Sequence, residues 1–95
     1  MALTHENSAF DSQEDVVLAV LEERRRQDKK WGEQNHHPLY WLGILMEEVG
    51  EAAKAAIEHH VGHWGDYQKE LIHVAAVAIA AIESAERNRI SYGDR

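Results

Sequence analysis

Hydrophobic residues recur at helical spacing in three segments of the chain, and each segment predicts one helix. The first segment carries one narrow aliphatic stripe: Val16, Val17, Val20 and Leu21. Asp11, followed three residues later by Glu14, has the pattern of a capping box, so we predict Asp11 as the N-cap of this helix. We expect Gly32 to end the helix after Trp31, because glycine is favoured just past helix C-termini.

The second predicted helix covers residues 39–58, and Pro38 stands in its first turn, where proline is well tolerated. Its apolar side chains fall within an arc of about 120° on a helical wheel, which is an amphipathic pattern. They are Trp41, Leu42, Leu45, Val49, Ala52, Ala53 and Ala56. Residues 59–65 contain two glycines, and we predict a turn there.

The third predicted helix covers residues 66–87 and is apolar on every side between residues 74 and 82. A helix that is apolar all round must be buried all round, and two partner helices in a chain of 95 residues cannot cover it. It is either a tight core within one chain or a helix shared between subunits, and the second is favoured. We therefore predict an all-α fold: a bundle of three main helices completed by oligomerisation, as a homodimer or homotetramer. Residues 11–95 would form this single domain, preceded by a polar arm at residues 1–10.

Composition excludes several classes of function. The net charge is −7, from 10 basic and 17 acidic residues, and no basic stripe offsets it, so we expect no binding to nucleic acid. Cysteine is absent, which excludes disulfides and thiolate metal sites. The longest apolar stretch, residues 71–82, is broken only by His73 and is shorter than the roughly 20 residues that span a bilayer. With no signal-peptide pattern at the N-terminus, these features predict a cytoplasmic protein without a membrane partner.

Acidic residues follow helical spacing in the second and third segments. Glu47, Glu48 and Glu51 lie within two turns of the second helix, and Glu70 and His73 are one turn apart on the third. Glu48 falls only about 20° outside the apolar arc, so it should be partly buried. Antiparallel packing of the two helices would bring Glu48, Glu51, Glu70 and His73 together.

A lone pair of glutamates is most often a solvated helix face, but carboxylates that share a partly buried seam repel one another unless a cation neutralises them. Oxygen ligands suit Mg²⁺, with Mn²⁺ as the alternative. The spacing therefore favours a divalent metal site over a solvated acidic face.

These motifs resemble the MazG-like, all-α nucleoside triphosphate pyrophosphohydrolase superfamily. The family pattern is Glu-Glu-x-x-Glu, a spacer, and Glu-x-x-Asp; here the first half occupies residues 47–51 and the second begins at Glu70 after 18 residues. Gln-Asp-Lys-Lys-Trp-Gly at residues 27–32 and Ile-Leu-Met-Glu-Glu-Val-Gly-Glu-Ala-Ala at residues 44–53 are similar to small phage-type members. His73 replaces the family's final aspartate. Asp66, one turn before Glu70, is a substitute carboxylate, although a helix N-cap is the favoured role for it.

The resemblance implies metal-dependent hydrolysis of (deoxy)nucleoside triphosphates to the monophosphate and pyrophosphate. It assigns four residues to the metal: Glu48, Glu51, Glu70 and His73. Glu47 would bind a further ion or orient the attacking water. The alternative is a catalytically weak module of the same fold that binds or senses nucleotides, with His73 as its signature.

The triphosphate and base also need partners on the protein. Lys30 and Lys54 are candidates for phosphate, against the ordinary alternative that each is a solvated surface charge. Trp31 is a candidate for stacking on the base, and a packing role is equally consistent with the sequence. Trp41 and Trp64 are predicted to be packing residues.

Overall fold

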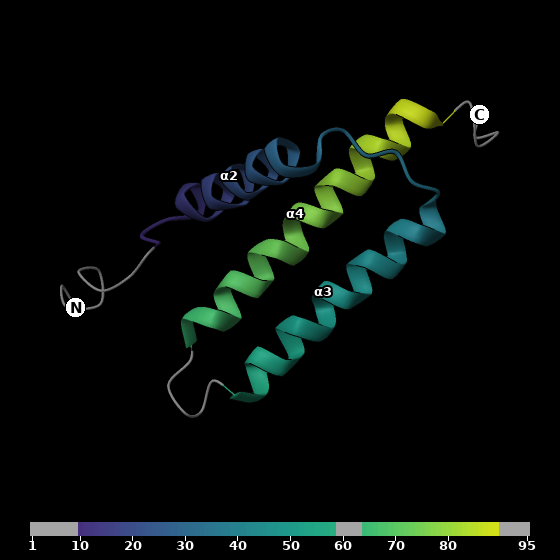
Figure 1. The fold of residues 1–95 in the computed structure, drawn as a ribbon. Helices are drawn as coiled ribbons and strands as arrows, with labels where there is room; N and C mark the ends of the chain where they lie inside the picture. The colour runs from purple at the N-terminus through teal and green to yellow at the C-terminus, as the bar shows by residue number, and fades with distance from the viewer. Residues whose placement is uncertain (1–9, 59–63, 90–95) are drawn as a thin grey trace.

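The computed structural model describes residues 10–58 and 64–89, which form three α-helices and no strand. These are α2 (Gln13–Trp31), α3 (Pro38–Glu58) and α4 (Trp64–Asn88) (Figure 1). The predicted all-α class with three main helices is therefore confirmed. None of the three combines the length and the apolar character that crossing a membrane requires.

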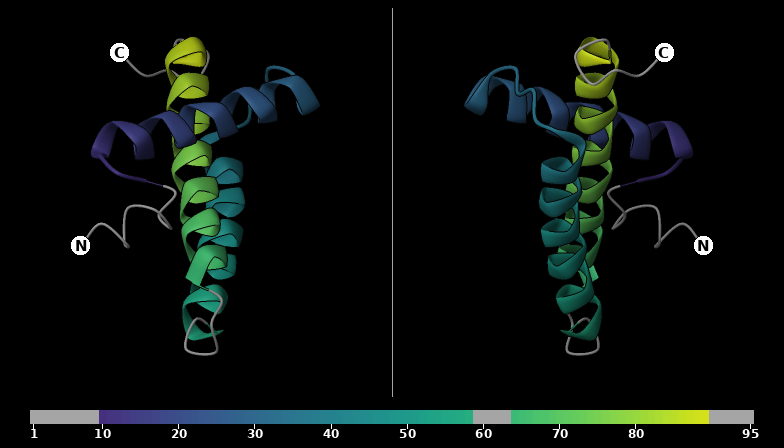
Figure 2. Two further views of the ribbon diagram at one scale, coloured as in Figure 1. Left: turned by 90° about the vertical axis from the view of Figure 1, so that its left-hand side faces the viewer. Right: turned by 90° about the vertical axis from the view of Figure 1, so that its right-hand side faces the viewer.

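Helices α3 and α4 run antiparallel along most of their length, and α2 packs against α4 on the side away from α3 (Figure 1). Figure 2 shows α2 lying steeply across α4 on one side of this hairpin. Helix α4 is thus the central element, since both other helices pack against it. This arrangement brings the middle of α2 close to the middle of α4.

The start of α2 differs from the prediction by one residue. Ser12, not Asp11, is the N-cap: its backbone is extended and its Oγ accepts a hydrogen bond of 3.2 Å from the N–H of Asp15. The Asp15 carboxylate in turn accepts a 3.0 Å bond from the Asp11 N–H. The short serine hydroxyl reaches the third helical N–H directly, so the predicted box of Asp11 and Glu14 is wrong.

Other helix ends follow the sequence more closely. Gly32 ends α2 as predicted, with φ +74° and its N–H bonded to the Asp28 carbonyl at 2.8 Å. Pro38 opens α3. Helix α4 begins at Trp64, so Asp66 lies in its first turn and the predicted N-cap role is wrong. Residues 1–9 of the predicted arm and residues 59–63 of the predicted turn lie outside the described residues.

The core lies between α3 and α4. Trp41 packs there against Val77 and Ala80, joined by the partly buried Ile44, Leu45 and Ala81. Trp41 is only 5% exposed, which confirms its predicted packing role. Three further alanines are buried: Ala52, Ala55 and Ala76. Small side chains allow the two helices to approach closely, but the apolar area they bury is small.

Candidate metal centre

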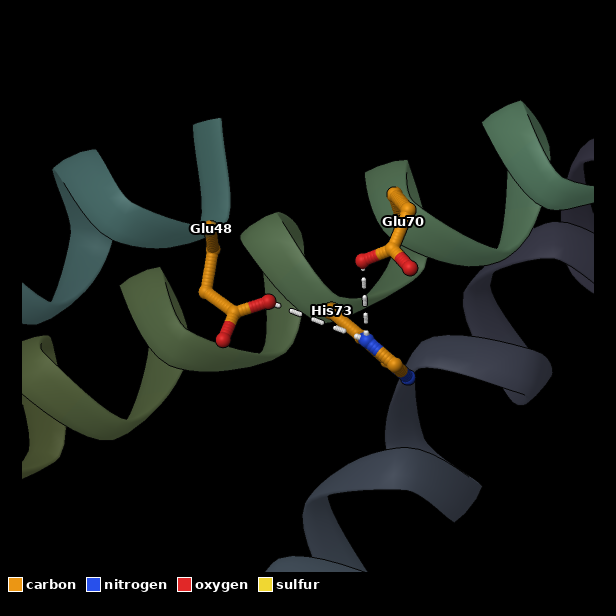
Figure 3. Close-up of side chains that lie close together, drawn as sticks. All are labelled: Glu48, Glu70 and His73. Carbon is orange, nitrogen blue, oxygen red and sulfur yellow. Dashed lines mark ion pairs between the residues drawn. The ribbon is translucent and has the colours of Figure 1, made fainter. Parts of the chain in front are cut away.

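Three of the four predicted metal ligands meet in space. Glu48 comes from α3, and Glu70 and His73 come from successive turns of α4 (Figure 3). One ligand atom from each lies within 4.8 Å of the others. The antiparallel hairpin is what brings them together, because it places the middle of α3 beside the first half of α4.

The spacing of these donors suits one small cation. His73 Nδ1 lies 3.3 Å from Glu70 Oε1 and 3.7 Å from Glu48 Oε1. Neighbouring ligands at about 2.1 Å from a shared ion stand roughly 3.0–3.5 Å apart in octahedral or tetrahedral geometry. Two carboxylates and one imidazole, all partly buried, therefore fit a divalent metal ion with little movement.

The charges around Glu48 also favour a bound cation. Burial raises the pKa of the Glu48 carboxyl, the positive charge of a protonated His73 opposes this, and the carboxylates of Glu70, Glu51 and Glu23 raise the pKa further. A carboxylate that is costly to ionise beside other carboxylates gains from a nearby cation. The centre is thus short of positive charge.

The other two acidic residues of the motif lie farther out. Glu51 is exposed and does not belong to the group of three, although its charge acts on Glu48. Glu47 is also exposed and outside the group. Successive residues on a helix point about 100° apart, so Glu47 faces away when Glu48 faces α4.

Glu23 of α2 was missed by the sequence interpretation. Its Oε2 lies 3.7 Å from His73 Nε2, and its side chain is only 11% exposed. Arg26 donates two hydrogen bonds to this carboxylate, at 2.8 and 2.7 Å, and Gln27 donates one at 3.2 Å. The bonds from Arg26 lower the pKa of Glu23 despite its burial, and His73 adds to the lowering.

A signal for Glu23 was present in the sequence. The residue follows Val16 by seven positions and Val20 by three, so it continues the aliphatic stripe of α2. An acidic side chain that is largely buried needs a partner, and the crossing of α2 over α4 provides His73 for Glu23.

A groove of about 1110 Å³ adjoins the cluster, and both Glu48 and His73 contribute to its lining. The rest of its lining comes from the second half of α2, the segment that follows it, and α3 and α4. Arg87 supports that segment by bonding to Asn35 Oδ1 and to the Gln34 carbonyl. The groove is large enough for a nucleotide-sized ligand.

The predicted substrate residues divide between groove and surface. Trp31 lines the groove and is 52% exposed, whereas neither lysine belongs to its described lining. The Lys30 ammonium lies 4.8 Å from the centre of the Trp31 ring, in a cation–π contact. Lys54 is exposed on α3. The cationic side chains that line the groove are three arginines: Arg24, Arg26 and Arg87.

The chain matches no family model, no curated protein and no solved structure. The resemblance in the motifs therefore rests on the residues of this chain, and the geometry of the cluster is an observation independent of it.

Proposed function

We propose that the protein is a metal-dependent pyrophosphohydrolase that converts (deoxy)nucleoside triphosphates to the monophosphate and pyrophosphate, as its resemblance to MazG-like enzymes suggests. The observation that carries the proposal is the convergence of Glu48, Glu70 and His73 beside a groove of about 1110 Å³. A metal-ligand group next to a space of nucleotide size is the minimum that this chemistry requires.

Glu48, Glu70 and His73 would hold the ion, Mg²⁺ or alternatively Mn²⁺, with Glu51 at the edge of the site. A divalent ion supplies neutralisation of phosphate charge and activation of water for in-line attack. Water then forms a bond to the α-phosphorus, the bond from that phosphorus to the bridging oxygen breaks, and pyrophosphate leaves. Glu47 faces away from these three ligands, so we propose it for a further ion rather than for orienting this water.

The walls of the groove would position the nucleotide. Trp31 presents an exposed aromatic face for stacking against a base. Arg24 and Arg87 line the same space and offer planar guanidinium groups that suit phosphate oxygens. Lys30, held over the Trp31 ring, is proposed to meet phosphate beside Trp31, whereas the exposed Lys54 is outside the described lining and has no assigned contact.

The proposed working form is a homo-oligomer. In the single chain, large apolar side chains remain exposed on all three helices: Val16, Val17, Leu18 and Leu21; Leu39, Leu42, Met46 and Ile57; Leu71 and Ile82. Ile82 is 68% exposed, although it belongs to the segment of α4 predicted to be buried all round. So many large apolar side chains left in contact with water suit burial against a second copy of the chain. Sedimentation equilibrium tests this, and a monomer at micromolar concentration would contradict it.

A nucleotide-binding or sensing module is the second candidate, favoured by one feature. His73 stands where the resembling family has an aspartate, and imidazole is a weaker ligand for Mg²⁺ than a carboxylate. Such a module would bind triphosphates with metal and release them unchanged.

The deciding experiment incubates the protein with a panel of ribo- and deoxynucleoside triphosphates in Mg²⁺ and in Mn²⁺. Monophosphate and pyrophosphate are both quantified. Glu48→Gln, which keeps the size of the side chain, should abolish turnover, and Glu58→Gln at the exposed end of α3 is the matched control. Turnover that survives in Glu48→Gln would contradict the proposed site. Binding without turnover in the wild type would favour the module.

A further inference from the structure

The imidazole of His73 is flanked by acidic groups at both of its nitrogens. Nδ1 faces Glu70 and Glu48 at 3.3 and 3.7 Å, and Nε2 faces Glu23 at 3.7 Å. Figure 3 shows Nδ1 turned to the two carboxylates of the hairpin, with α2 passing the opposite edge of the ring. The two nitrogens therefore have different surroundings, one a candidate ligand and one a candidate donor.

This division matches the way proteins tune histidine ligands. A histidine that binds a metal through one nitrogen usually donates the N–H of the other to a carboxylate, which fixes the tautomer and the ring orientation and makes the ligand more basic. For His73 this requires a proton on Nε2 and a lone pair on Nδ1. Once a cation occupies Nδ1 and neutralises the carboxylates there, a carboxylate at Nε2 favours that tautomer, because it accepts the N–H and repels a lone pair.

Glu23 is itself held in place for this role. Both of its carboxylate oxygens accept hydrogen bonds from Arg26, and Oε2 accepts another from Gln27. A bidentate pair of this kind restricts the rotation of the carboxylate. Nearby, Arg24 bonds Glu83 of α4 at 2.7 Å, a separate contact between α2 and α4 that involves neither Glu23 nor His73. The orientation of the Glu23 carboxylate is thus set by Arg26 and Gln27 of its own helix.

We propose that Glu23 is the positioning residue of His73. It accepts a hydrogen bond from Nε2–H once a metal ion is bound at Nδ1, and it thereby recruits α2 to a centre whose ligands all come from α3 and α4. The inference rests on the metal centre of the proposed function. The inference also predicts which ion the centre binds more tightly. An imidazole that Glu23 makes more basic favours Mn²⁺ over Mg²⁺.

The test compares Glu23→Ala, Glu23→Gln and the control Glu83→Ala in the full-length protein. Glu83→Ala removes another acidic group at the contact of α2 with α4, the partner of Arg24, without touching His73. Free Mn²⁺ is titrated by electron paramagnetic resonance. The tautomer of His73 is read from its ¹⁵N shifts with and without Zn²⁺ as a diamagnetic substitute, and circular dichroism reports the fold.

We expect Glu23→Ala to weaken Mn²⁺ binding about 10- to 100-fold and to shift the Nε2 resonance of the Zn²⁺-bound form, because the Nε2–H loses its acceptor. Glu23→Gln keeps an amide oxygen as acceptor, so it should recover part of the affinity. Glu83→Ala should bind Mn²⁺ as the wild type does. Affinity for Mg²⁺ should fall less than affinity for Mn²⁺ in Glu23→Ala.

Equal Mn²⁺ affinity and equal Nε2 shifts of the Zn²⁺-bound forms in the wild type and Glu23→Ala would overturn the inference. So would an equal loss of affinity in Glu83→Ala, because the effect would then follow from displacing α2. Turnover is measured separately. A wild type that binds Mn²⁺ through His73 but hydrolyses no triphosphate would contradict the proposed enzyme and leave the role of Glu23 standing.

Discussion

The contact between α3 and α4 and the contact between α2 and α4 are held together by different forces. The first is apolar and close, with Trp41, Val77 and Ala80 buried within it. The second contains no fully buried residue of α2 and relies on polar contacts, among them Arg24 with Glu83 and Glu23 with His73. Burial stabilises the hairpin at any salt concentration, whereas charged contacts near solvent weaken as salt rises.

The candidate metal centre lies where these two contacts meet. Its ligands belong to the apolar hairpin, and the groups that surround them from outside belong to the charged crossing. The helices that carry the ligands and the helix that surrounds them are therefore held by different contacts. Substitutions in the α3–α4 contact and in the α2–α4 contact should have distinct effects on stability and metal binding.

The largest effect is expected in the hairpin core. Trp41→Ala should lower the free energy of unfolding by about 3–5 kcal/mol, because it removes the largest buried side chain between α3 and α4. Urea unfolding followed by circular dichroism measures this. Trp31→Ala, at a half-exposed tryptophan of α2, should stay within about 0.5 kcal/mol of the wild type. Similar losses in the two variants would contradict the contrast between the regions.

Metal addition should give the next largest effect. Mn²⁺ at about 100 times its dissociation constant should raise the free energy of unfolding by about 2.7 kcal/mol, since only the folded chain brings the ligands together. Glu48→Gln should lose this gain, which differential scanning fluorimetry detects as an unchanged melting temperature. The matched control Glu58→Gln should keep it. A shift of equal size in Glu48→Gln would place the ion elsewhere.

A substitution in the charged contact between α2 and α4 should lower the free energy of unfolding by a smaller amount. Arg24→Ala removes a side chain that is only 12% exposed and pairs with both Asp28 and Glu83, so we expect a loss of about 0.5–1 kcal/mol. The loss should shrink at about 0.5 M salt, because screening weakens the wild-type pairs. Hydrogen exchange should quicken in α2 and not in α3.

The exposed Arg25→Ala is the control for that experiment. Faster hydrogen exchange across α3 as well as α2 would show that the contact between α2 and α4 supports the whole fold. It would contradict the contrast between this contact and the apolar contact of α3 with α4.

The smallest effect concerns pH in the metal-free protein. The pKa of Glu48 is raised in the folded chain above its ordinary value of 4.5, so the charged carboxylate opposes folding. The free energy of unfolding therefore grows as pH falls through the raised pKa toward 4.5. The pKa of Glu23 is lowered, so its contribution is present above 4.5 and is lost only as pH falls through the lowered value. Between pH 7 and 5, the wild type should therefore gain stability relative to Glu48→Gln.

Urea unfolding at a series of pH values measures that difference between the two proteins. A difference that does not change with pH, or a wild type that loses stability relative to Glu48→Gln, would contradict the assigned burial and charge environment of Glu48.

Much of the fold could be predicted from sequence because its signals are local. Helical periodicity, Pro38 and Gly32 gave the three helices nearly to their ends. The cluster of Glu48, Glu70 and His73 was also predictable, since one-turn spacing and an antiparallel hairpin suffice to bring these residues together. The N-cap was displaced by one residue because the Ser12 hydroxyl accepts from the Asp15 N–H, while the Asp15 carboxylate accepts from the Asp11 N–H.

The contribution of Glu23 could not be predicted in the same way. It depends on the angle at which α2 crosses α4, and that angle follows from side-chain packing rather than from a repeat in the sequence. The groove also could not be predicted from a repeat in the sequence, because its arginines come from α2 and from α4, which are far apart along the chain. Lys54 and Glu47 carry the right charge for their predicted roles, but helix geometry turns them toward solvent.

The lack of any fully buried residue in α2 has an evolutionary consequence. A helix that contributes little to the folding free energy accepts substitutions at little cost, so its side chains other than Glu23 are free to diverge while the hairpin stays constant. Because α2 also supplies Trp31 and Arg24 to the groove, the residues most open to mutation are those that would meet a ligand. New ligand preferences would arise in α2, on a scaffold that need not change.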